Sequence, residues 1–73
     1  MAQVEVKTEI TGNVWKIVAE IGQVLEEDDP IMILESMKME IPVSAPEGGV
    51  LKEIRVEEGA TITEDTVVAI LEA

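Results

Sequence analysis

The residues most able to do chemistry lie at six consecutive positions near the middle of the chain. They are Glu35-Ser36-Met37-Lys38-Met39-Glu40, in which one lysine lies between two methionines and the trio lies between two acidic residues. Strand-like segments at 30–34 and 41–45 flank them, which predicts a hairpin with Met37 and Lys38 at its tip. Tight hairpin turns favour Asn or Gly at positions of positive φ. Neither is present here, so the choice of residues at the tip indicates function.

Lys38 is the reactive group of this segment. An ordinary lysine has a pKa of about 10.4 and stays protonated at neutral pH, and the carboxylates of Glu35 and Glu40 favour the charged form. We therefore expect no Schiff-base catalysis. Acylation by another enzyme does not require a lowered lysine pKa, because that enzyme supplies the activated acyl donor. Acylation would create a long neutral arm on a rigid hairpin. Met37 and Met39 suit an adaptable contact with a partner, although either could instead fold back over the edge of a small core.

Composition excludes several classes of function. The chain has 73 residues, which allows a single domain, taken as 1–73. It contains neither cysteine nor histidine, which removes the commonest nucleophile–base pairs and metal ligands and leaves carboxylates as the only metal option. Because the sixteen carboxylates are spread at strand-exposed spacing, we interpret them as solvated strand faces and expect no catalytic residue and no metal site. A net charge of −11 and a single aromatic residue, Trp15, argue against nucleic-acid and membrane partners. With no membrane-length apolar run and no signal pattern, we expect a cytoplasmic location.

A repeat organises the rest of the chain. Shifting the sequence by 37 positions places Gly12–Glu35 on Gly49–Glu72 without a gap. Glycines align with glycines and apolar residues with apolar residues, so each half is predicted to form the same supersecondary unit, related to the other by a pseudo-two-fold axis. Seven or eight short strands and no helix predict a small β-sandwich or flattened barrel. This symmetry would place both chain termini at the end opposite Lys38.

Alternation of apolar and polar residues locates individual strands. Runs at 4–10 and 14–19 are predicted strands, with Trp15 facing inward. Proline suits the first residue of a strand or an edge strand, which is how we interpret Pro30 and Pro42. The remaining lysines are predicted to face solvent; they are Lys7, Lys16 and Lys52.

The central motif, followed by Ala45-Pro46-x-x-Gly49, closely resembles the biotinyl domain of biotin-dependent carboxylases, and the resemblance covers nearly the whole chain. It implies an all-β flattened barrel-sandwich hybrid of two four-stranded antiparallel sheets, with the modified lysine on the hairpin between the halves. It also implies covalent biotin on Lys38. Met37 and Met39 would be recognised by a biotin protein ligase, and the flanking hairpin residues would be Glu35, Ser36 and Glu40.

Three departures from the family pattern bear on local structure. Ser36 stands where the family usually has alanine, a small-for-small replacement. Asp28 and Asp65 stand where related sequences place a turn glycine, and aspartate tolerates the left-handed conformation better than most residues. Residues 8–11 replace a proline-rich approach to the first turn.

The resemblance implies a carrier rather than an enzyme. Biotin on Lys38 would take up a carboxyl group at a biotin carboxylase and deliver it to a carboxyltransferase. The first alternative is lipoate on the same lysine, attached by a lipoyl ligase for an oxo-acid dehydrogenase, although lipoyl domains usually show Asp-Lys at the tip. The second alternative is an unmodified acidic protein-binding module. We expect a free-standing monomer, which would meet its partners by diffusion without the gain in effective concentration that a tether provides.

Overall fold

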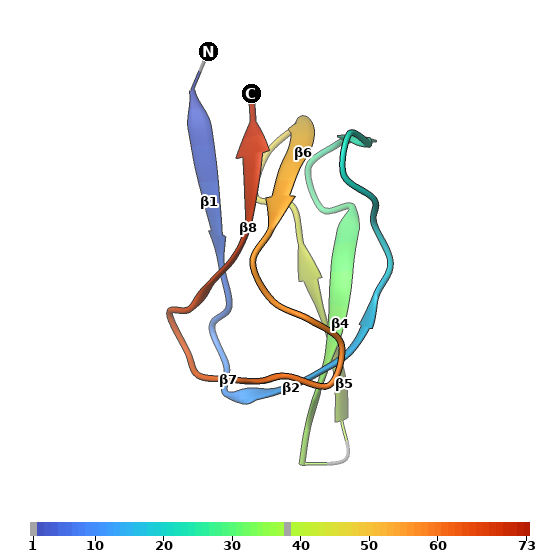
Figure 1. The fold of residues 1–73 in the computed structure, drawn as a ribbon, viewed down its shortest axis with the longest axis vertical. Helices are drawn as coiled ribbons and strands as arrows, with labels where there is room; N and C mark the ends of the chain where they lie inside the picture. The colour runs from blue at the N-terminus through green and yellow to red at the C-terminus, as the bar shows by residue number, and fades with distance from the viewer. Residues whose placement is uncertain (1, 38) are drawn as a thin grey trace.

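The computed structural model describes residues 2–37 and 39–73, and within these ranges all regular structure is β (Figure 1). Eight strands form two antiparallel sheets. One sheet contains, in spatial order, β1 (Gln3–Lys7), β8 (Val67–Glu72), β6 (Gly49–Ile54) and β3 (Val24–Leu25). The other contains β5 (Met39–Ser44), β4 (Pro30–Ser36), β2 (Gly12–Ile17) and β7 (Thr61–Ile62). The predicted fold class, two four-stranded sheets packed face to face, is confirmed.

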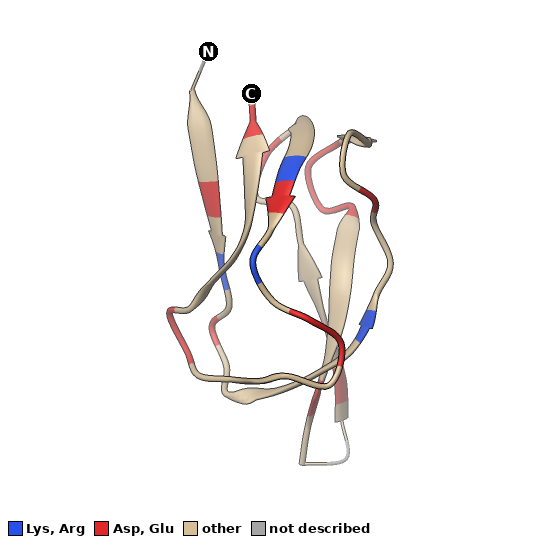
Figure 2. Ribbon diagram, in the orientation of Figure 1, with Lys and Arg blue, Asp and Glu red and all other residues tan. Residues whose placement is uncertain are grey.

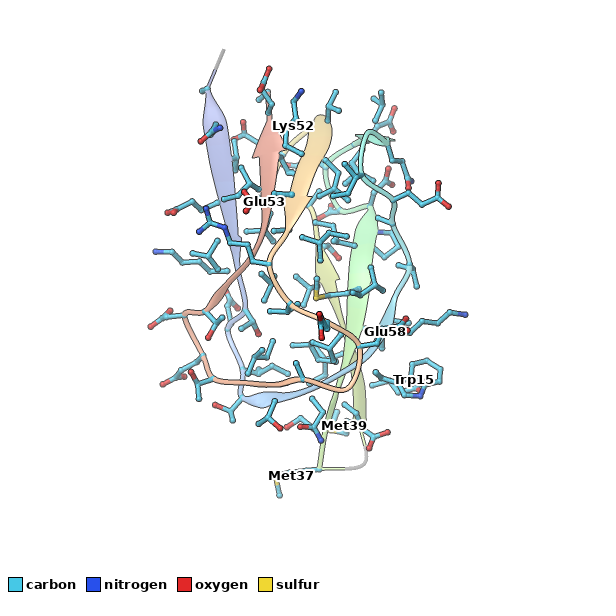
Figure 3. The ribbon with its side chains drawn as sticks, viewed as in Figure 1. Trp15, Met37, Met39, Lys52, Glu53 and Glu58 are labelled. Atoms are coloured by element: carbon cyan, nitrogen blue, oxygen red, sulfur yellow. The ribbon has the colours of Figure 1, made fainter. Side chains whose placement is uncertain are left out.

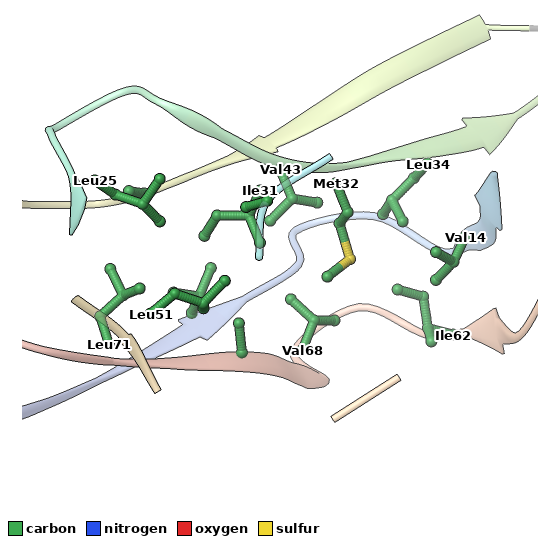
Figure 4. Packing of buried hydrophobic residues seen from close by; sticks show 14 residues of the cluster. Val14, Leu25, Ile31, Met32, Leu34, Val43, Leu51, Ile62, Val68 and Leu71 are labelled. Atoms are coloured by element: carbon green, nitrogen blue, oxygen red, sulfur yellow. The ribbon is translucent and has the colours of Figure 1, made fainter. Parts of the chain in front are cut away.

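A single apolar layer between the sheets forms the core (Figure 4). The large side chains at its centre are fully buried: Leu25, Ile31, Met32, Leu34, Leu51 and Leu71. Burial of one such side chain contributes roughly 1.5–3 kcal/mol. Slipping a long strand by one residue would turn its buried set outward, so this layer fixes the register of the sheets. In the part of the chain described, no helix is long and apolar enough to cross a membrane.

The 37-residue repeat is present in the hydrogen bonds as well as in the sequence. The Gly22 N–H donates to the Leu51 carbonyl at 2.7 Å, and its repeat equivalent, the Gly59 N–H, donates to the Val14 carbonyl at 2.7 Å. Each half therefore closes its turn on a strand of the other half, which interlocks the two. The symmetry also extends beyond the sequence match, because β1 and β5 hold equivalent edge positions in their sheets. The predicted pseudo-two-fold arrangement is confirmed.

Aspartate occupies left-handed turn positions in both halves, as expected. The φ angle is 73° at Asp28 and 66° at Asp65. The first of these turns is closed by the Asp29 N–H, which donates to the Glu26 carbonyl at 3.0 Å, while the Asp29 carboxylate accepts from the Glu26 N–H at 2.9 Å. The turn geometry that glycine would supply is thus reached with aspartate.

Two strands end earlier than their alternation predicts. The first ends at Lys7, where the buried Thr8 begins a turn. Its hydroxyl accepts from the Ile10 N–H at 3.2 Å and donates to the Ile10 carbonyl at 3.0 Å, forming the turn without proline. The second is β2, which leaves the ladder after Ile17. The N–H groups of the next two residues, 18 and 19, both donate to the carbonyl of Ile31.

Trp15 is exposed, and the prediction that it faces inward is wrong. Its side chain is 51% exposed. Val14 pairs with Leu34 while Lys16 pairs with Ile33, so Trp15 is the extra residue of a β-bulge. Simple alternation fails across a bulge, where two residues oppose one. Trp15 and Lys16 therefore both face solvent while Val14 is buried.

The remaining strand predictions are confirmed. Pro30 is the first residue of β4, and Pro42 lies on β5, which is an edge strand. The side chains predicted to face solvent are exposed: Lys7, Lys16 and Lys52. Both termini lie at one end of the long axis of the 36 × 19 × 18 Å domain, and the end of the β4–β5 hairpin lies at the other (Figure 1).

Candidate functional site

The predicted hairpin is confirmed and projects from the end of the domain opposite the termini (Figure 1). Strands β4 and β5 pair along their whole length, and the last pairs before the tip are Glu35 with Glu40 and Ser36 with Met39. Lys38, the predicted attachment residue, lies outside the described residues. Its two neighbours in the chain, Met37 and Met39, are described.

The two methionines are presented to solvent. Met37 is 93% exposed and Met39 is 63% exposed, and Figure 3 shows both at the hairpin end. The alternative in which either one covers the core is therefore wrong. Met37 also adopts a φ of 49°, a left-handed conformation that costs a residue without a short polar side chain on the order of 1–3 kcal/mol. An exposed apolar side chain on a strained backbone adds nothing to the fold, so contact with a partner is the better explanation.

Strand β2 supports the base of the hairpin through a close backbone approach. Asn13 pairs with Glu35, and a Cβ atom on Gly12 would lie 2.7 Å from the Glu35 carbonyl oxygen. Only glycine fits this contact without a shift of backbone. Asn13 also links β2 to β7, because its Oδ1 accepts from the Thr61 hydroxyl at 2.9 Å. Strand β2, itself anchored to β7, thus holds β4 close to the tip end of the hairpin.

The hairpin carries negative charge beside its tip. Glu35 and Glu40 are directly opposite each other and both are exposed; Figure 2 shows acidic positions on both strands near the hairpin end. Like charges directly opposite are destabilising, so this pair does not serve stability. It creates a negative potential beside the methionines, which favours a partner with a basic surface. Ser36, next to the pair, is half-buried.

Two other features of the domain bear on chemistry away from the hairpin. Among the described residues, no group of three or more acidic side chains is arranged to hold a metal ion. A groove of about 310 Å³ runs between the edge strands β1 and β5, lined by apolar side chains together with Thr8, Ser44 and three charged residues. The Thr8 hydroxyl donates to the Ile10 carbonyl rather than to a charged side chain of this lining, so Thr8 is not paired with a base.

Sequence reasoning missed the exposed position of Trp15 near the hairpin (Figure 3). A signal was available in the repeat, because the 37-residue shift aligns Trp15 with Lys52. Lys52 lies in the matching bulge of β6, between residues 51 and 53, which pair with consecutive residues of β8. A charged residue at the equivalent position indicates that both positions face water.

Comparison with known proteins gives a consistent result. The model of the Biotin_lipoyl family, described as "Biotin-requiring enzyme", matches residues 2–71. The Biotin/lipoyl attachment protein of Bacillus subtilis is 40% identical over 62 residues, which is 85% of each chain. The biotinylated protein TB7.3 homolog of Mycobacterium leprae is 34% identical over 67 residues, covering 92% of this chain and 94% of that protein.

A solved structure has the same fold. The urea carboxylase of Kluyveromyces lactis superposes with a TM-score of 0.93 at 30% sequence identity. The match covers 99% of the present chain but 6% of the carboxylase. The whole chain therefore has the fold of one small part of that enzyme.

Proposed function

Because the chain belongs to the biotin/lipoyl attachment family, we propose that it is a biotin carrier modified on Lys38. The observation that carries this proposal is the hairpin tip. Both residues beside Lys38 are exposed methionines, at the end of the domain farthest from its termini. A modified side chain at this position would be free to reach separate active sites while the β-sandwich stays rigid.

The residues around Lys38 fit an attached arm. The ladder between β4 and β5 continues up to Ser36 and Met39, so an acyl group on the Lys38 amine would extend from the end of a paired hairpin. Met37 and Met39 would provide the apolar contact for a biotin protein ligase, and Glu35 and Glu40 would attract basic side chains beside it. Biotin, when bound, supplies the ureido nitrogen that takes up and releases a carboxyl group.

The protein would act as a substrate and carrier, not as an enzyme. Its partners would be the biotin protein ligase and then a biotin carboxylase and a carboxyltransferase. Support for such partners comes from the 30% identity to part of a urea carboxylase. We propose a cytoplasmic monomer, since the acidic surface opposes self-association through charge repulsion.

Lipoate is the second candidate for the same lysine. The Bacillus subtilis relative is described as a biotin/lipoyl attachment protein, and the hairpin geometry would present either arm equally well. The two methionines in place of an Asp-Lys tip favour biotin. Without any modification, the acidic surface would leave a protein-binding module as the remaining function.

Mass spectrometry of the protein from its native host tests the proposal. We expect an intact mass increased by one biotinyl group and a modified peptide that contains Lys38. Lys38→Arg should remove the increment while the protein remains folded, and Lys52→Arg, a change at another exposed lysine, should retain it. A lipoyl increment would move the function to the lipoyl alternative. No increment would refute both carrier functions and leave the binding module.

A further inference from the structure

The sheet containing the hairpin carries an apolar row on its outer surface. Ile33 of β4 is paired with Lys16 on one side and with Pro42 on the other. Leu34, the next residue of β4, is fully buried, so by alternation Ile33 and its partner Pro42 face outward. Trp15, the bulge residue beside Lys16, opposes the same residue of β4 and is half exposed (Figure 3).

The repeat-related surface of the other sheet is different. Ile70, the equivalent of Ile33, is paired with Glu53 and Glu5. The equivalent bulge residue is Lys52, whose Nζ lies 3.9 Å from Glu72 Oε2. Two glutamates are paired with the isoleucine in one half, whereas lysine and proline are paired with it in the other and the bulge residue beside the lysine is tryptophan. Because the equivalent backbone positions in the two halves accept different side chains, the fold does not require tryptophan and proline at these positions.

The apolar row lies close to the tip and beside the carboxylate pair. Glu35 and Glu40 are two positions farther along the same strands as Ile33 and Pro42, a spacing of roughly 7 Å. From the body toward the tip, the surface therefore presents an apolar row and then two carboxylates. A complementary protein surface would place an apolar contact over the row and basic side chains over the carboxylates.

We propose that this surface, consisting of Trp15, Ile33, Pro42, Glu35 and Glu40 and called here the Trp15 face, is the docking surface for the enzyme that acylates Lys38. This inference rests on the proposed function. An unmodified lysine side chain is short, with a four-carbon stem, so the acylating enzyme must touch the tip. A specific interface covers about 800 Å² on each partner, far more than two methionines supply. Exposed tryptophan is the residue type most enriched among side chains that dominate such interfaces.

Kinetics of labelling test the inference with matched variants. The initial rate of biotinylation by the biotin protein ligase of the same organism is measured against carrier concentration. Trp15→Ala and Trp15→Lys should each raise the KM for the carrier by about tenfold or more. Trp15→Lys copies the residue that the fold already holds in the equivalent bulge, so it should fold. Lys52→Ala and Ile21→Ser are the controls and should keep the parental KM; Ile21 is an exposed apolar residue in the loop between β2 and β3, a segment that extends to the terminal end of the domain (Figure 1).

A direct measurement of contact uses the single tryptophan of the chain. The Lys38→Arg protein, which cannot turn over, is prepared with 5-fluorotryptophan and titrated with unlabelled ligase. We expect the single ¹⁹F resonance to shift or broaden saturably, with the same concentration dependence as binding. A purely structural role for Trp15 would not produce this change.

The outcomes separate this inference from the proposed function. Labelling of the parental chain with unchanged KM in both Trp15 variants, or a ¹⁹F resonance unaffected by saturating ligase, would overturn the Trp15 face and leave the carrier function intact. Absence of labelling on Lys38 in the parental chain would overturn the proposed function and this inference with it. A raised KM for the Trp15 variants alone would support the inference.

Discussion

At the hairpin tip, Met37 combines a φ of 49° with a side chain that is 93% exposed. Neither property stabilises the fold: the backbone conformation is strained, and the side chain buries almost no surface. Met39, at the start of β5, is also mostly exposed. The two residues thus form an apolar pair displayed on a charged surface, and their role in recognition can be separated from stability by substitution.

Substitutions at the two methionines should have unequal effects on modification. Met37→Leu keeps an apolar side chain of similar volume, so we expect the labelling rate of Lys38 to fall by less than about threefold. Met39→Asp places a third carboxylate beside Glu35 and Glu40, so we expect a loss of more than about tenfold, or about 1.4 kcal/mol. Time-resolved mass spectrometry with excess biotin measures both. Labelling of the Met39→Asp variant at the parental rate would show that Met39 is not part of the recognition surface. Melting temperatures of both variants equal to that of the parental chain would exclude a folding defect.

At the scale of elements, the long hairpin is held by β2 through a contact that tolerates no side chain. The Cβ position of Gly12 is 2.7 Å from the Glu35 carbonyl oxygen, and that of Gly49 is 2.9 Å from the Glu72 carbonyl oxygen. The two glycines are equivalent in the repeat, but only one of them contacts the hairpin. Gly12 contacts the hairpin next to its tip, whereas Gly49 contacts the strand that leads to the C-terminus.

Alanine at these two glycines should separate stability from function. We expect Gly12→Ala and Gly49→Ala each to lower the free energy of unfolding by about 1–3 kcal/mol, because backbone must move to admit the methyl group. Only Gly12→Ala should also slow labelling of Lys38, since the shift occurs beneath the hairpin end. Denaturant unfolding and labelling of the folded protein measure the two effects. Equal slowing by both variants would contradict a specific role for β2 in positioning the tip.

For the whole molecule, the large net negative charge is an unfavourable feature. The chain carries −11 on a domain of 36 × 19 × 18 Å, and only two ion pairs are found among the described residues, both at the surface. At low ionic strength the screening length is about 30 Å, close to the 36 Å length of the domain. Repulsion among carboxylates therefore opposes folding, while the same field attracts basic partners.

Sodium chloride should consequently stabilise the protein. Raising its concentration from about 10 mM to about 0.5 M shortens the screening length to a few ångströms, and we expect the melting temperature to rise by on the order of 5 °C. The double variant Glu27→Lys, Glu47→Lys changes two exposed residues. Each change removes one negative charge and adds one positive charge, so the net charge goes from −11 to −7. Its melting temperature should depend less on salt. A melting temperature independent of salt in the parental chain would show that repulsion is not limiting.

Local chemistry made much of this molecule predictable from sequence. The hairpin, the proline positions, the two aspartate turns and the repeat depend on short-range patterns of alternation, φ preference and missing donors, which one segment carries by itself. The repeat then implied the placement of the termini opposite the tip, because a two-fold axis between the halves places Glu72, the equivalent of Glu35, at the other end of the domain.

Features that depend on how two strands pair could be identified only from the tertiary structure. The two-residue strands β3 and β7 exist only because β6 and β2 bind them, and so short a segment has no periodicity to detect. The bulge at Trp15 is likewise a property of β2 and β4 together: the extra residue is defined by consecutive pairing of Leu34 and Ile33, not by the composition of β2. Sequence alternation alone therefore placed Trp15 in the core, whereas the register against its neighbour places it in solvent beside the hairpin.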